Sequence, residues 1–300
     1  MLDRYLPEGR RLSAPDNLAA CASKGGLLAA QDRGAILEGR VLLCDANHDL
    51  IVRLGPYTGR IPRDQAALGI SEGTTREIAI LSRVGKPVCF TVESVEGEEP
   101  DLRIVLSRRR AQLQAQEALM ERLRPGMVIP ATVTHLEPFG AFVDIGCGLV
   151  SIPHPGCRFT VGQEILTAVL DTEPELGRVK LTHRELLGTW QENAARLSSG
   201  MTVSGYVRGI KDYGAFIELF PNLSGLAEPR AALQEGDRVS VYLKAVLPER
   251  MKIKLLVIDR LPAEPAPPPL TYYITGGTLT RWRYAPECCA KSGMETVFGG

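Results

Sequence analysis

The sequence predicts a mainly β protein made of three small barrels in tandem, joined by short helical linkers and followed by a proline-rich spacer and a small tail. Three observations lead to this fold class. The chain contains an internal repeat of about 65 to 75 residues, the repeats consist mostly of short alternating segments, and helix-forming sequence is confined to the stretches between them.

Length and composition describe an ordinary globular chain. Of 300 residues, 44% are apolar and 23% are charged, which excludes global disorder. Lysine plus arginine equals aspartate plus glutamate at 35 each, which excludes a uniformly basic nucleic-acid wrapper, so any anion-binding surface is local. Apolar runs reach only about five residues, far below the roughly 20 of a membrane span. The N-terminus shows no secretion signal, so we expect a cytoplasmic chain.

The repeat is clearest at an offset of 74 residues. This shift brings the string Phe139–Phe142 (FGAF) onto Tyr213–Phe216 (YGAF), and Gly126 onto Gly200, without a gap. A weaker copy lies upstream, where residues 34–41 match residues 126–133 at an offset of 92. Each unit contains strand-like segments rich in β-branched and aromatic residues, such as TVSGYVRGI (202–210) and RVSVYLKAV (238–246). Five such strands in so small a unit predict a closed, OB-type barrel, because closure removes exposed edges.

The connecting segments differ from the repeats in composition. Residues 108–124 consist of strong helix formers, with Leu119, Met120 and Leu123 on one face, and Pro125 ends the predicted helix. Arg108–Arg110 at its start serve either solubility or phosphate contact. A second helical linker is predicted from Arg184 to Arg196. Beyond the proline-rich spacer, the aromatic and basic tail is predicted to form a hairpin around Gly276–Gly277.

The repeated aromatic pairs are the main functional signal. Strict strand alternation places two residues three apart on opposite faces, but a bulge at Gly140 brings Phe139 and Phe142 to one face. Gly214 makes the same prediction for the equivalent pair in the third unit. Two coplanar rings on an open barrel face form a stacking platform for unpaired bases, each stack worth about 1–3 kcal/mol. The alternative is that one ring of each pair belongs to the core.

Cations near these rings are candidates for holding phosphates. Lys211 precedes the third-unit pair, and Lys244, Lys252 and Lys254 lie on the last two predicted strands with Arg250 between them. Residues 200–260 hold nine cations against seven acids, whereas residues 126–188 hold four against seven. The third unit is therefore the better anion binder by charge. His154, near the proposed platform, is either an ordinary surface histidine or a contact to base or phosphate.

The string PGMVIPATVTHLEPFGAFVDIG resembles the S1 RNA-binding domain, and MTVSGYVRGIKDYGAFIEL matches the same pattern again. The resemblance implies a binding surface at Phe139, Phe142, His154 and Arg178 in the second unit. In the third unit it implies Tyr213, Phe216 and Lys252, with Glu228 in the histidine position. The predicted RNA-binding residues are Phe139, Phe142, His154, Arg178, Lys180, Lys211, Tyr213, Phe216, Lys244, Lys252 and Lys254.

The first unit departs from the pattern. Its segment CDANHDLIVRLG (44–55) has no phenylalanine, tyrosine or tryptophan where the platform belongs, so we expect poor RNA binding and a role in assembly or protein contact. Other strings, including SRVGKPVCF and PNLSGLAEP, look like the multi-domain ribosomal protein S1 homologues of clostridia-like bacteria. The resemblance implies a monomeric, non-enzymatic protein that binds single-stranded mRNA in translation, possessing no cofactor and contacting the small ribosomal subunit. The alternative is a protein-interaction scaffold or adaptor associated with ribosomes or RNA decay.

Catalytic and metal motifs are missing from the sequence. It contains no phosphate-binding G-x-x-x-x-G-K-[ST] loop, no G-x-S-x-G elbow and no C-x-x-C pair, and its seven cysteines are scattered. The predicted divisions are an N-terminal extension (1–31), a degenerate S1-like domain (32–107), a helical linker (108–124), an S1 domain (125–184), a linker (185–198), an S1 domain (199–260), a spacer (261–270) and a tail (271–300).

Overall fold

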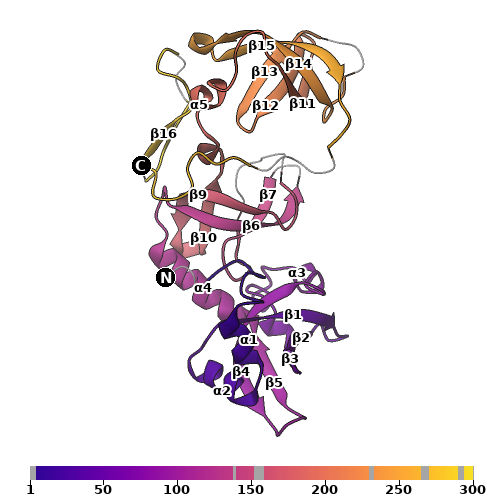
Figure 1. Cartoon of the computed structure of the whole chain (residues 1–300). Coiled ribbons are helices and arrows are strands. Elements are labelled where there is room, and N and C mark those ends of the chain that lie inside the picture. The colour runs from indigo at the N-terminus through magenta and orange to yellow at the C-terminus, as the bar shows by residue number, and fades with distance from the viewer. Residues whose placement is uncertain are drawn as a thin grey trace.

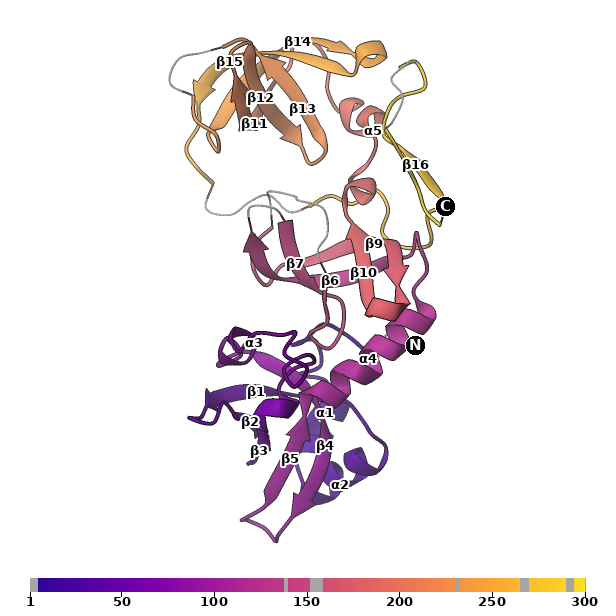
Figure 2. The same cartoon turned by 180° about the vertical axis from the view of Figure 1, so that it is seen from behind.

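The computed structural model describes residues 5–137, 140–151, 159–229, 233–264, 270–289 and 294–299. Figures 1 and 2 show three β units stacked end to end in chain order, with the two termini beside the stack. The prediction of a mainly β fold made of tandem five-stranded units is confirmed. No helix in the described ranges is long and apolar enough to cross a membrane.

The first barrel closes with the strand order β1-β2-β3-β5-β4. Its strands are β1 (Leu37–Cys44), β2 (Leu50–Leu54), β3 (Tyr57–Ile61), β4 (Pro87–Glu96) and β5 (Arg103–Ser107), and a short helix, α3 (Ile78–Leu81), lies between β3 and β4. The N-terminal segment is part of this unit, because α1 (Pro15–Cys21) and α2 (Lys24–Asp32) bury Cys21 and Leu27 in its core.

The third barrel repeats this topology with the closed order β11-β12-β13-β15-β14. Its strands are β11 (Thr202–Lys211), β12 (Gly214–Phe220), β13 (Leu223–Ala227), β14 (Arg238–Leu247) and β15 (Lys252–Arg260). The alternation seen in the sequence sets the core: along β14, Val239, Val241 and Leu243 are all buried, while the residues between them face outward.

Within the described residues, the strands of the middle unit pair in the same way as those of the two closed barrels, with one exception. The pairing of the third strand with the fifth, which closes the other two barrels, is not formed among these residues. The strand order of the middle unit is β10-β9-β6-β7-β8. The strands are β6 (Val128–Glu137), β7 (Gly140–Asp144), β8 (Val150–Ser151), β9 (Glu164–Glu173) and β10 (Arg178–Thr182). Ala141 and Val143 of β7 point into its core.

Helix α4 (Arg108–Arg122) joins the first barrel to the middle unit, as the sequence predicts. Leu119 and Leu123 are buried in the middle core, which explains their shared face. Both roles considered for the three arginines require exposed side chains, and Arg108 does not meet this condition. Arg108 is buried in an ion pair with Glu8, Arg109 pairs with Glu72 and Arg110 pairs with Glu93, so the arginines bind acidic side chains of the protein itself.

The second linker is broken rather than continuous. A 3-10 helix over Arg184–Leu187 ends at Gly188, whose φ is +82°, and α5 (Trp190–Ala194) then begins with a Thr189–Glu192 capping box. A Cβ at Gly188 would lie 2.6 Å from the ring of Tyr273 in the tail. The glycine therefore permits both the turn and the close approach of the tail.

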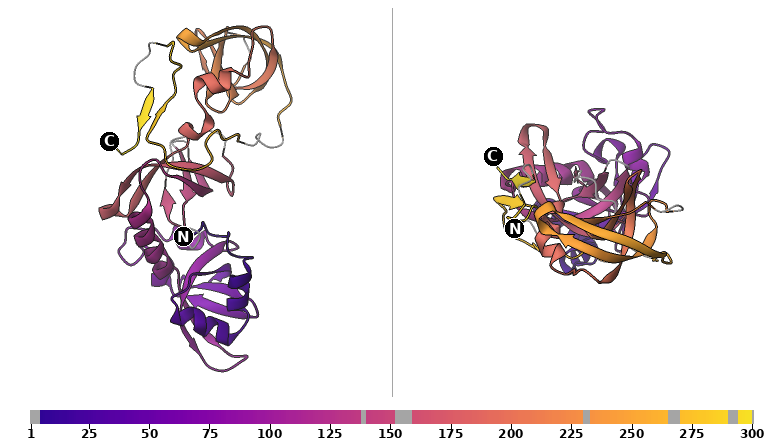
Figure 3. Two further views of the ribbon diagram at one scale, coloured as in Figure 1. Left: turned by 60° about the vertical axis from the view of Figure 1, so that its left-hand side comes forward. Right: turned by 90° about the horizontal axis from the view of Figure 1, so that it is seen from above.

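The tail is a folded clip, and the predicted hairpin at Gly276–Gly277 is wrong. The hairpin instead pairs β16 (Arg281–Arg283) with β17 (Glu295–Val297), while Gly277 accepts a 3.0 Å hydrogen bond from the Val128 amide. Trp282 and Phe298 pack on Leu186 of the linker. Figure 3 shows this hairpin beside the linker between the second and third units. The tail is too short to form a hydrophobic core of its own, so it is stabilised by packing on the linker and the middle unit.

Candidate nucleic-acid interface

The outer face of the third barrel carries an exposed pair of aromatic rings. Phe216 lies between the buried residues Ala215 and Ile217 of β12, so its side chain points away from the core. Tyr213 occupies the turn before this strand and is 64% exposed. The two ring centroids are 6.1 Å apart and the ring planes meet at 86°. The rings share a face as expected, but the expectation that they are coplanar is wrong.

The backbone that brings these rings together also differs from the predicted bulge. Gly214 pairs in register with Lys211, and the irregularity lies on the opposite strand, between Val207 and Gly209. Tyr213 reaches the outer face because it is in the turn, where strand alternation does not apply. Gly214 has a φ of +153°, and a Cβ there would lie 2.3 Å from the carbonyl oxygen of Ala227. The position therefore requires glycine for close packing of β12 on β13.

An apolar side chain and a cation extend this face across the sheet. Phe216 pairs with Leu226 of β13, and Leu226 pairs with Lys254 of β15. All three side chains project from the same side, and Lys254 is exposed. Neighbouring strands lie about 5 Å apart, so a ring, an apolar contact and an ammonium group follow one another within about 10 Å. This arrangement suits a base stacked on the ring with its phosphate near the lysine.

The other predicted cations of this barrel fall into two groups. Lys211 and Lys252 are exposed, and neither forms an ion pair within the described ranges. Lys244 donates to Glu228 at 2.7 Å, and this hydrogen bond holds the pKa of Glu228 below its usual range. Glu228 occupies the position that the S1 resemblance gives to histidine. Glu228 therefore pairs with Lys244 at the surface, whereas Lys211, Lys252 and Lys254 form no ion pair within the described ranges.

The middle unit presents a related face with one additional ring. Phe142 projects outward between the core residues Ala141 and Val143 of β7. Directly across the β6–β7 ladder stands His135, whose ring centroid lies 6.0 Å from that of Phe142 at an interplanar angle of 38°. Sequence reasoning missed His135. The register of the β6–β7 hairpin could have identified it, since that register sets His135 opposite Phe142. At the equivalent position of the third barrel, Gly209 lies opposite Phe216.

The remaining predicted residues of the middle unit have mixed outcomes. Phe139 and His154 lie outside the described residues. Arg178 is exposed at the start of β10. Lys180 pairs with Glu173 and with Asp171 at 3.4 Å, and these hydrogen bonds raise the pKa of Lys180. The carboxylates thus neutralise Lys180, consistent with the acidic balance of this unit.

The first barrel lacks the platform. The β1–β2 register places Ile51 where the middle unit has Phe142, because Val41 pairs with Val52 as Val133 pairs with Val143. His48, three residues earlier, is held through Nδ1 by a carboxylate oxygen of Glu77 at 3.0 Å. No ring pair therefore stands at this position of the first barrel.

In the part of the chain that the structure describes, we find no group of side chains arranged to bind a metal ion and no paired cysteines. This part contains no cluster of three or more potential ligands that could hold a metal ion. Six cysteines are described, all as free thiols, with Cys288 exposed and Cys21, Cys89, Cys147 and Cys289 buried.

Comparison with known proteins connects these faces to a family. The chain is 30% identical over 196 residues to small ribosomal subunit protein bS1 of Leuconostoc lactis, covering 56% of this chain and 46% of that protein. It is also 30% identical over 209 residues to bS1 of Streptococcus pneumoniae, covering 60% and 52% respectively. Over about 200 residues the chain is similar to bacterial ribosomal protein bS1. It spans about half the length of the bS1 proteins that it matches.

Two further comparisons add little. No family model matches the sequence. Among solved structures, a multidomain protein with nucleic acid binding domains from Streptococcus pneumoniae is 14% identical, with a TM-score of 0.25, over 75% of this chain and 73% of that one. That score is too low to establish a shared overall arrangement. The bS1 relationship therefore depends on the sequence matches.

Proposed function

We propose that this chain is a non-enzymatic, cytoplasmic protein that binds single-stranded RNA through the outer faces of its middle and third units. The observation that carries the proposal is the outward-facing pair of the exposed Tyr213 and the half-buried Phe216, with Leu226 and Lys254 continuing the same face. Stacking on ring faces tolerates any base, so binding is sequence-tolerant, and phosphate contacts make it dependent on salt.

The ribosomal role follows from the homologues. The relatives are small-subunit proteins, so we propose that the chain acts as a monomer that holds mRNA near the small ribosomal subunit during translation. Co-sedimentation with small subunits over a series of salt concentrations tests this role. A chain that binds RNA but never sediments with subunits at low salt would restrict the proposal to RNA binding.

The direct test is a titration of the full chain with a short, unstructured, fluorescent RNA. The Tyr213→Ala/Phe216→Ala double variant should bind more weakly by about 2–4 kcal/mol if two stacks are lost. Tyr206→Phe is the matched control, because it removes only a hydroxyl that contacts Glu264 on the surface. Equal affinity of the double variant and the wild type, with the fold intact, would refute the platform.

A second candidate function is suggested by the first barrel. Several large apolar side chains are exposed there, among them Ile78 at 64%, Leu43 at 47% and Val84 at 46%. Such residues favour a protein contact over RNA binding for this unit. Failure of the whole chain to bind RNA at low salt would promote the scaffold or adaptor function over the RNA-binding one.

A further inference from the structure

A cavity of about 390 Å³ lies between the first barrel and the middle unit. Its lining on the first-barrel side includes Arg10, Arg83 and Lys86, and the middle unit contributes Thr132, Thr134 and Asp144. Three cations from two segments far apart in the sequence therefore meet on one wall. The S1 resemblance assigns none of these residues to binding.

Two of the three cations are weakly held and one is unpaired. Arg10 contacts Glu164 at 2.7 Å, but that carboxylate side chain is 61% exposed, and exposed pairs contribute only about 0–1 kcal/mol. Arg83 reaches Glu8 only at 3.4 Å. Lys86 is exposed and forms no ion pair within the described ranges. An anion that binds these three cations therefore breaks only weak existing ion pairs.

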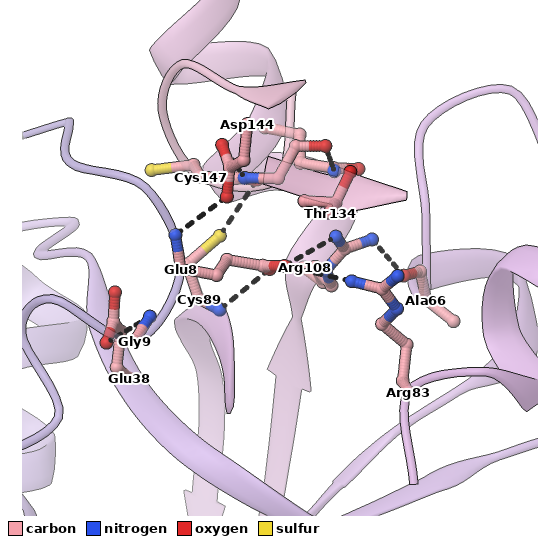
Figure 4. Close-up of polar contacts among 12 residues, drawn as sticks. Glu8, Gly9, Glu38, Ala66, Arg83, Cys89, Arg108, Thr134, Asp144 and Cys147 are labelled. Carbon is pink, nitrogen blue, oxygen red and sulfur yellow. Dashed lines mark hydrogen bonds and ion pairs between the residues drawn. The ribbon is translucent and has the colours of Figure 1, made fainter. Parts of the chain in front are cut away.

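The acidic residues of the wall are already engaged (Figure 4). Glu8 accepts from Arg108 at 2.7 and 3.0 Å and from the Cys89 amide at 3.1 Å. Burial opposes ionisation of Glu8, but the Arg108 guanidinium keeps its pKa below the usual value. Asp144 accepts from three backbone amides, and burial together with the nearby Glu8 charge raises its pKa to about 7. The three lining cations thus face one exposed carboxylate, that of Glu164, besides the engaged carboxyl groups of Glu8 and Asp144.

Two buried polar atoms of the lining residues lack a partner. Arg83 Nε and Thr132 Oγ1 make no hydrogen bond in the part of the chain that the structure describes. Both can donate a hydrogen bond, and a buried donor without an acceptor costs about 1–3 kcal/mol. Both atoms are inaccessible to solvent, so they contact a phosphate in the cavity only if the side chains turn toward it.

The cavity continues the aromatic face of the middle unit. Asp144 lies two residues after Phe142 on β7, so both project from the same side of the sheet about 7 Å apart. Thr134, which lines the cavity, donates from Oγ1 to the carbonyl oxygen of Phe142 at 3.1 Å. A strand stacked on Phe142 and His135 would reach the cavity with an adjacent nucleotide.

We propose that this cavity binds a backbone phosphate of the RNA strand that lies across Phe142, with Arg10, Arg83 and Lys86 as its cations. The inference rests on the proposed function. It gives the first barrel a part in RNA binding that its lack of a ring pair does not suggest. This barrel supplies charge at the junction, while the middle unit supplies the stacking surface.

The test compares Lys86→Gln with Lys24→Gln in the full chain. Lys24 is the matched control because it lies in α2, at the end of the first barrel remote from the middle unit (Figure 1). Each variant is titrated with an unstructured RNA of about 12 nucleotides over a salt series. For Lys86→Gln, the negative slope of log K against log salt should become shallower by about 0.7, because one phosphate contact is lost. The affinity for the RNA at 0.1 M salt should fall about fivefold. Lys24→Gln should match the wild type.

Two further arms separate this inference from the proposed function. If Phe142→Ala weakens RNA binding while Lys86→Gln and Arg10→Gln leave the affinity and the slope unchanged, the cavity assignment is overturned and the RNA-binding proposal stands. If none of the three variants matters, the cavity assignment and RNA binding by the middle unit are both overturned, and the Tyr213→Ala/Phe216→Ala variant then decides whether the third barrel binds RNA. Inorganic phosphate provides the third arm: loss of its binding in Lys86→Gln with unchanged RNA affinity would make the cavity a free-phosphate site and overturn the RNA assignment.

Discussion

Removal of the Glu8 carboxylate should destabilise the junction between the first barrel and the middle unit. The side chains of Glu8 and Arg108 are 5% and 4% exposed, and within the described residues the one other acceptor of Arg108 is the carbonyl oxygen of Ala66 at 3.2 Å. The Glu8→Ala variant leaves a buried guanidinium without its counter-charge. Breaking such a pair costs about 3–5 kcal/mol, so the free energy of unfolding of this region should fall by that amount.

The assay must report on the first barrel itself. Both tryptophans, Trp190 and Trp282, lie in the linker and the tail, so their fluorescence follows the other half of the chain. Native-state hydrogen exchange of the buried amides of β4 measures the first barrel directly. Glu72→Ala is the matched control, because the Glu72–Arg109 pair is 43% and 30% exposed and should contribute at most about 1 kcal/mol.

A double-mutant cycle completes this test. Arg108→Met in the Glu8→Ala background removes the orphaned charge, so the double variant should be more stable than Glu8→Ala alone. If Glu8→Ala changes β4 protection no more than Glu72→Ala does, the junction pair behaves like a surface pair. That result would refute the reasoning from burial.

Three other predictions follow from the fold. Burial raises the pKa of Glu38 to about 7, so this carboxyl is protonated in the folded chain and ionised in the unfolded chain between about pH 4.5 and 7. Unfolding free energy should therefore decline with rising pH in that window, and Glu38→Gln should flatten the decline in urea titrations followed by circular dichroism. Gly214→Ala places a Cβ 2.3 Å from the Ala227 carbonyl oxygen and should lower third-barrel stability by about 1–3 kcal/mol. Gly209→Ala, whose Cβ would meet only the Glu235 carboxylate at 3.8 Å, should have little effect on thermal unfolding. Trp282→Ala should cost about 3–5 kcal/mol and expose the tail to limited proteolysis, and an uncut tail would contradict its role as a clip.

Local pattern predicted most of the β architecture. The repeat at 74 residues placed equivalent strands in two units, and the alternating segments 202–210 and 238–246 lie in strands β11 and β14. Strand patterning depends on near neighbours, so a single sequence contains it. Helix α4 was predictable for the same reason, because strong helix formers are followed by Pro125.

The incorrect predictions concern features of the structure that are determined by contacts between residues far apart in the sequence. Arg108 finds its partner 100 residues away in Glu8, and nothing in the local sequence indicates this pairing. The tail hairpin failed similarly, since Gly277 and Leu279 bond to the distant backbone of Val128 and Gly126 instead of to each other. His135 was missed because it is adjacent to Phe142 only through the ladder register.

Crosslinking of RNA to the full chain under ultraviolet light, with the crosslinked peptides mapped by mass spectrometry, measures most directly where the strand lies. The account predicts crosslinks in the peptides that contain His135 and Phe142 and in those that contain Tyr213 and Phe216, lost when salt is raised. Crosslinks confined to the helices of the first barrel or to the tail hairpin, with both ring faces unmodified, would contradict it.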